Sequence, residues 1–88
     1  MMTRKYKIAD KLIEVTSLYP DVHEYCKDYA AEGVPDFSVE ITQGDIDYER
    51  EKIAKEYAYE GKRAPNYSEG VLEETTVYRK IAAKNAAV

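Results

Sequence analysis

The stretch that decides the fold is PDFSVEITQGDI, residues 35–46. Its apolar residues at 37, 39 and 41 alternate with polar ones, as on a strand with one buried face. Thr42 then stands three residues before Asp45, the spacing of a capping box, in which two side chains bond the free backbone N–H groups at a helix start. The stretch therefore predicts a strand over 37–41 that leads directly into a helix.

A hairpin and a helix are predicted before this stretch. Residues 6–8 and 12–16 are rich in β-branched and aromatic residues of alternating polarity, with polar residues between them. After Pro20, which suits the first position of a helix, apolar residues recur at helical spacing, and Gly33 suits the position just beyond the end. The inward residues predicted for this helix are Val22, Tyr25, Cys26, Tyr29 and Ala30.

Two more helices are predicted after residue 42. The first has Ile46, Ile53, Ala54 and Tyr57 on its inward stripe and ends at Gly61. Ser68 is the expected N-cap of the second. Its predicted inward residues are Leu72, Thr75, Tyr78 and Ala82, with Val71 and Ile81 at the edges. The sequence thus predicts an α+β fold, in which the hairpin and strand 37–41 form a small antiparallel sheet packed with about three helices.

Size, charge and cysteine content restrict the class of protein. At 88 residues the chain fits one small domain, 1–88. Acidic residues outnumber basic ones by 17 to 13 and the basic ones are scattered, so we expect no nucleic acid partner. The single cysteine excludes an internal disulfide, and no stretch nears the ~20 apolar residues of a membrane span. We therefore expect a cytoplasmic protein with no membrane partner.

No group of residues meets the requirements of a catalytic, cofactor or metal motif. His23 and Cys26 are three residues apart on a predicted helix, but no second His or Cys completes a zinc site. Cys26 shares the apolar stripe, so a buried structural thiol is expected. Gly61-Lys62 lacks the hydroxyl residue and the earlier glycine of a P-loop, and Glu73-Glu74 is expected on a solvated face. We expect no catalytic activity, no cofactor and no metal.

Three groups of segments carry a resemblance: YKIA (6–9) with LIEV (12–15), CKDY (26–29) with PDFSV (35–39), and ERE (49–51) with LEETTVYRKIA (72–82). Together they resemble the N-terminal region of bacterial proteins related to HPr kinase and to phosphoenolpyruvate carboxykinase. In that family a longer catalytic portion follows, with a phosphate-binding loop that binds ATP and magnesium. No Gly-rich loop ending in Gly-Lys-Ser or Gly-Lys-Thr occurs here, so none of the family's catalytic positions carries over.

The resemblance implies an N-terminal accessory module of a longer protein, which packs against and organises a kinase-like ATP-binding domain in cis or in trans. The alternative is a stand-alone cytosolic adapter that binds a peptide or protein partner along a strand edge. A small metal-dependent enzyme built on His23 and Cys26 is a third reading. The expected interaction surface is Tyr78, Ile81 and Val71, because the last helix has more apolar residues than so small a core covers. In the isolated chain this surface would support a weak homodimer.

The chain alone is expected not to bind ATP, because it lacks the P-loop's backbone N–H cradle and magnesium-holding hydroxyl. Calorimetric titration with Mg-ATP should give only the heat of dilution, with a P-loop kinase domain as the positive control. A micromolar isotherm would contradict this prediction.

Overall fold

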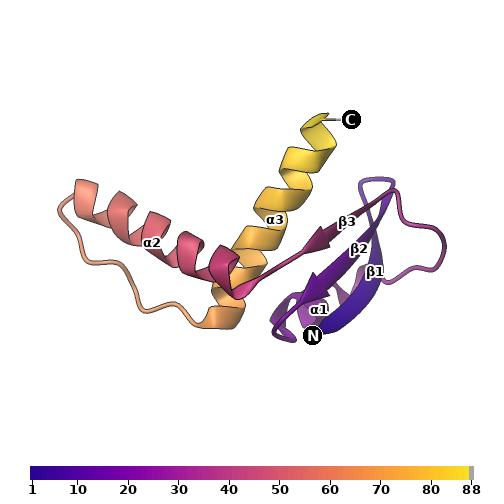
Figure 1. The fold of residues 1–88 in the computed structure, drawn as a ribbon, viewed down its shortest axis with the longest axis horizontal. Coiled ribbons are helices and arrows are strands. Elements are labelled where there is room, and N and C mark those ends of the chain that lie inside the picture. Colours follow the sequence, from indigo (N-terminus) through magenta and orange to yellow (C-terminus); the bar gives the residue numbers. More distant parts are fainter. Residues whose placement is uncertain (88) are drawn as a thin grey trace.

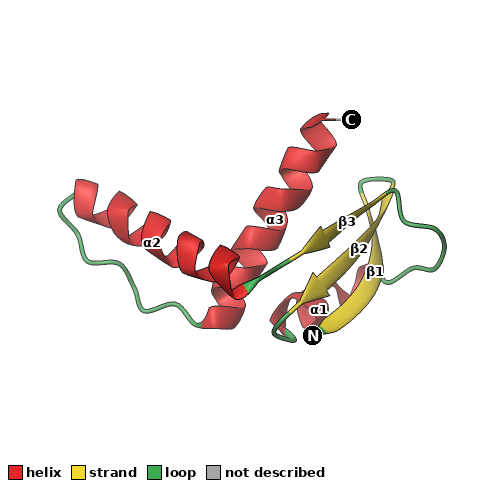
Figure 2. Cartoon of the chain, viewed as in Figure 1, coloured by secondary structure: helices red, strands yellow, loops and turns green. Residues whose placement is uncertain are grey.

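The structure, a computed structural model, describes residues 1–87. Its elements are β1 (Met2–Ile8), β2 (Lys11–Ser17), α1 (Asp21–Cys26), the 3-10 helix η1 (Lys27–Tyr29), β3 (Phe37–Glu40), α2 (Gln43–Tyr59) and α3 (Glu69–Ala87). The predicted α+β class is confirmed, since a three-stranded sheet packs with α-helices (Figure 1; Figure 2). No helix in this part of the chain is both long and apolar enough to cross a membrane.

The sheet has the order β1-β2-β3 and is mixed. β1 and β2 form the predicted antiparallel hairpin, whose tight turn holds Ala9 and Asp10 at positive φ, 50° and 65°. Two residues at positive φ match the twist of a hairpin. β3 lies parallel to β2, with Val39 opposite Val15, so the wholly antiparallel sheet that we predicted is wrong for this strand. The cause is the crossover through α1, which returns the chain in the direction of β2.

The core lies between one face of the sheet and the helices. Tyr6, Ile13 and Val15 point to this face, and Cys26 is buried as predicted. The full buried apolar set is Tyr6, Ile13, Val15, Val22, Cys26, Val39, Ile41, Ile46, Leu72, Val77 and Ile81. Side chains on the other face of the hairpin, such as Thr3 and Lys7, are polar and exposed, as the two-residue period of a strand requires.

α3 turns a different face inward from the one that we predicted. Leu72, Val77 and Ile81 are buried, whereas Thr75, Tyr78 and Ala82 are exposed. Ile81 is only 7% exposed, so the prediction that placed it on an exposed interaction surface is wrong.

Glu73 explains this rotation of α3. Its side chain is fully buried, and its carboxylate accepts hydrogen bonds from the backbone N–H groups of Leu18 (2.7 Å) and Tyr19 (3.1 Å), in the turn between β2 and α1. A buried carboxylate is tolerated when donors of this kind satisfy it. The expectation that Glu73 lies on a solvated face is therefore wrong. Because Glu73 must face inward, its helical neighbours Thr76 and Val77 are buried with it.

α2 begins as predicted and then leaves the body of the protein. Thr42 is its N-cap, and the capping box with Asp45 is complete. Among the residues of α2 only Ile46 and Glu49 are buried, and its far half projects away from the sheet (Figure 1). The radius of gyration is 14.0 Å, against about 12 Å for a compact chain of this length. Of the predicted inward stripe, Ile46 is buried and Ile53 packs against the core, whereas Ala54 is exposed.

Replacing the buried carboxylate should be costly. Glu73→Ala leaves two part-buried N–H donors without their acceptor, so we expect a loss of about 2–4 kcal/mol in the free energy of unfolding, measured by urea denaturation. Glu32→Ala, which removes the same charge from an exposed loop, should change it by no more than about 0.5 kcal/mol. Equal effects of the two substitutions would contradict the role of Glu73.

Candidate functional site

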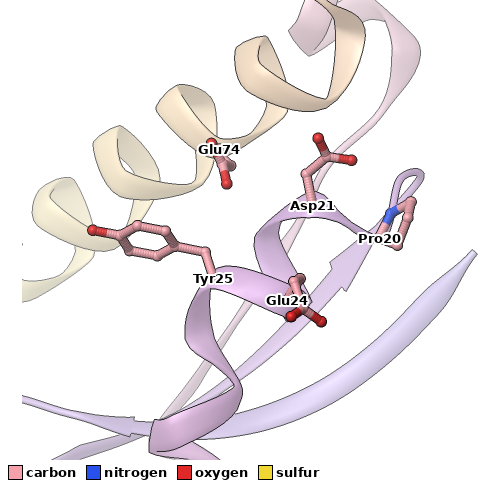
Figure 3. Close-up of a pocket in the computed structure, with 5 residues that line it drawn as sticks. All are labelled: Pro20, Asp21, Glu24, Tyr25 and Glu74. Atoms are coloured by element: carbon pink, nitrogen blue, oxygen red, sulfur yellow. The ribbon is translucent and has the colours of Figure 1, made fainter.

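A pocket of about 520 Å³ lies between α1 and α3 (Figure 3). Pro20, Asp21, Glu24 and Tyr25 line it from the α1 side, and Glu74 lines it from α3. Figure 3 shows Glu74 reaching from α3 toward the α1 side chains and the ring of Tyr25 lying across toward α3. We call these five residues the α1–α3 pocket.

Gly70 allows the two helices to approach this closely. A Cβ at position 70 would collide with the carboxyl group of Asp21. Asp21 therefore lies against the first turn of α3, where the helix dipole favours a negative charge. Ser68 caps the same turn as predicted, because its Oγ accepts a hydrogen bond from the N–H of Val71 (3.3 Å).

Two tyrosines form one rim of the pocket. The rings of Tyr25 and Tyr78 meet edge to face with centroids 5.9 Å apart, although 64% of Tyr25 and 45% of Tyr78 stay exposed. Val71, also exposed, lies seven residues before Tyr78, about two turns, and so on the same side of α3. Burial, followed by the contact with Tyr25, raises the pKa of Tyr78. We call Tyr25 and Tyr78 the aromatic rim; Val71 lines a separate hollow between α2 and α3, with Ile53 and Tyr67.

Two of the three predicted surface residues are exposed, and the third is buried. Tyr78 and Val71 lie at the surface as expected, and Ile81 does not. Tyr25 is the residue that the sequence missed, since helical spacing assigned it to the same inward stripe as Val22 and Cys26, which are buried. Its position directly after the acidic residue Glu24 was the only available sign that it borders a polar surface.

Three carboxylates converge on the pocket. Glu24 forms an exposed ion pair with Lys27 (2.7 Å). Within residues 1–87, neither Asp21 nor Glu74 takes part in an ion pair. Burial, and then the nearby charge of Asp21, raise the pKa of Glu74. The pocket is therefore an acidic hollow in which two carboxylates have no ion-pair partner among the described residues.

Of the two residues considered for metal binding, His23 has other partners and Cys26 is buried. The Nδ1 of His23 contacts the hydroxyl of Tyr6, and its Nε2 lies 3.1 Å from the carbonyl oxygen of Met2, so the ring joins α1 to β1. Burial raises the pKa of the Cys26 thiol. In the part of the chain that the structure describes, no three His, Cys, Asp or Glu side chains are arranged to hold a metal ion.

The substitution Glu74→Gln should stabilise the fold at neutral pH. The raised pKa means that the folded state favours protonated Glu74, so its stabilising contribution is present below the unfolded pKa of ~4.3 and is lost as pH rises through the folded pKa. Glutamine stays uncharged at every pH, so the variant does not lose this stability as the pH rises. The urea midpoint should rise at pH 7, and the gain should shrink toward pH 4.

The control is Glu32→Gln, which removes one charge from an exposed loop. A gain for Glu74→Gln that is matched by Glu32→Gln, or that does not change with pH, would contradict the origin of the shift.

Comparisons of the chain with protein-family models, with curated proteins and with solved structures found no match. The resemblance to proteins related to HPr kinase therefore stays a prediction from the sequence. The site itself is defined by the geometry of α1 and α3.

Proposed function

We propose that this chain is a non-catalytic, cytoplasmic accessory module that packs against and organises an ATP-binding domain like that of HPr kinase and phosphoenolpyruvate carboxykinase. The observation that carries the proposal is the aromatic rim beside the α1–α3 pocket. Exposed tyrosines that border a hollow are typical of the residues that supply binding energy at protein interfaces.

The exposed area of the chain supports the same proposal. The accessible surface is 5850 Å², whereas a compact protein of this mass exposes about 5,300 Å². The excess agrees with the projecting half of α2. A second domain would cover surface that this small core leaves open.

The alternative, an adapter that binds a peptide along a strand edge, has weaker support. Ile41 donates its N–H to β2, so the alternate residues Ser38 and Glu40 face the outer edge of β3. Their carbonyl oxygens accept hydrogen bonds from Lys84 (2.6 Å) and Lys80 (3.0 Å) of α3. Lysines over an edge hinder the addition of another strand. A peptide that adds to β3 would have to displace both lysines.

Binding of the chain to a separately produced ATP-binding domain of an HPr kinase-like protein tests the proposal. We expect a complex with micromolar affinity in calorimetry. Tyr78→Ala should weaken it roughly tenfold or more, because a rim tyrosine loses its buried contact. Tyr59→Ala is the matched control, since this tyrosine is 94% exposed at the far end of α2.

Two outcomes would contradict the proposal. One is the absence of any complex at about 100 μM of each protein, because the dissociation constant would then be well above the micromolar value that we expect. The other is equal weakening by Tyr59→Ala and Tyr78→Ala, which would move the contact to α2. The weak homodimer stays a separate prediction, tested by sedimentation of the chain alone at several concentrations.

A further inference from the structure

The aromatic rim and the α1–α3 pocket form one continuous surface with two chemical characters. Tyr25 belongs to both, and its ring meets Tyr78 on α3. Beside the rings lie Asp21 and Glu74, which have no ion pair within residues 1–87. The faces of tyrosine rings attract cations, and so do carboxylates. Both halves of the surface therefore favour the same kind of partner group.

We propose that this surface binds a basic segment of the partner domain, one that presents an arginine or lysine beside an aliphatic side chain. The cation lies between Asp21 and Glu74, and the aliphatic groups pack on Tyr25 and Tyr78. This inference rests on the proposed function and adds to it the chemistry of the partner. An arginine suits the position best, since a planar guanidinium both stacks on rings and bonds carboxylates.

The charges around the surface support this occupant over others. Lys27 is paired with Glu24, where both side chains are well exposed and the ion pair is weak. The whole chain carries a net charge of −4. A second copy would bring the same carboxylates to the surface, and an acidic segment would be repelled in the same way. A basic segment would instead be attracted by the carboxylates of the pocket and by the net negative charge of the chain.

The surroundings of Glu74 favour a cationic group beside it. Its pKa is raised by burial and by the charge of Asp21. A guanidinium or ammonium group placed beside both carboxylates would favour their ionised forms. Binding of the basic segment would thus relieve an unfavourable pair of like charges within the module.

The experiment uses two five-residue peptides, acetylated and amidated, with the sequences LRALR and LEALE. Each is titrated into the ¹⁵N-labelled full chain, and amide shifts are followed by NMR. We expect LRALR to shift the amides of α1 and the middle of α3, and LEALE to shift neither. The variant Asp21→Asn/Glu74→Gln should weaken LRALR binding by about fivefold or more.

The control variant is Glu51→Gln/Glu56→Gln, which removes the same charge from the solvated side of α2. It should change LRALR binding by less than about twofold, because its charges lie far from the pocket and are screened. If the pocket variant changes amide shifts throughout the free chain, its fold has changed, and the salt dependence of wild-type binding is measured in place of the variant's affinity. Wild-type LRALR binding should then fall steeply between 50 and 300 mM salt, as a charge-driven contact does.

Equal weakening by the two variants, or shifts spread over α2 as well, would overturn the inference by showing nonspecific attraction. So would the absence of LRALR shifts at millimolar concentration. If the ATP-binding domain still binds and Tyr78→Ala still weakens it, the proposed function stands and only the basic chemistry of the partner is wrong. If the domain also fails to bind, both fail together.

Discussion

The hydrogen bonds of one buried carboxylate organise this fold. Glu73 of α3 accepts the backbone N–H groups of Leu18 and Tyr19, 55 and 54 residues earlier in the chain. These bonds fix the last helix against the end of the first hairpin and set its rotation. Because Leu72 and Val77 then face the core, Tyr78 and Val71 are left outside. The candidate surface is thus a consequence of where one charge had to be placed.

α2 is joined to the body by polar contacts more than by apolar packing. Asp45 pairs with Lys80 (2.8 Å), and Arg50 pairs with Glu69 (3.1 Å). Glu49 is almost completely buried, and its nearest cation, Arg79, lies 3.4 Å away without forming a hydrogen bond. A helix held in this way gains little from burial per residue, which explains why its far half extends from the core instead of lying on it.

Patterns of neighbouring residues predicted the helices and strands, and contacts between distant residues decided which of their faces are exposed. The capping box at Thr42, the cap at Ser68 and the hairpin could be predicted because each depends on residues a few positions apart. The parallel pairing of β3 could also have been predicted, because a helix was expected between strands 12–16 and 37–41 and a strand–helix–strand order favours parallel strands. The inward face of α3 could not be predicted from hydrophobic spacing, since its deciding residue, Glu73, is charged.

Gly70 makes two distant positions depend on each other. A Cβ at position 70 would overlap the carboxyl group of Asp21, so a larger residue there requires this side chain to leave its place beside α3. A larger residue at position 70 would therefore change the shape of the acidic hollow by displacing the Asp21 carboxylate. The glycine in the first turn of α3 thus helps to set where a carboxylate of α1 lies.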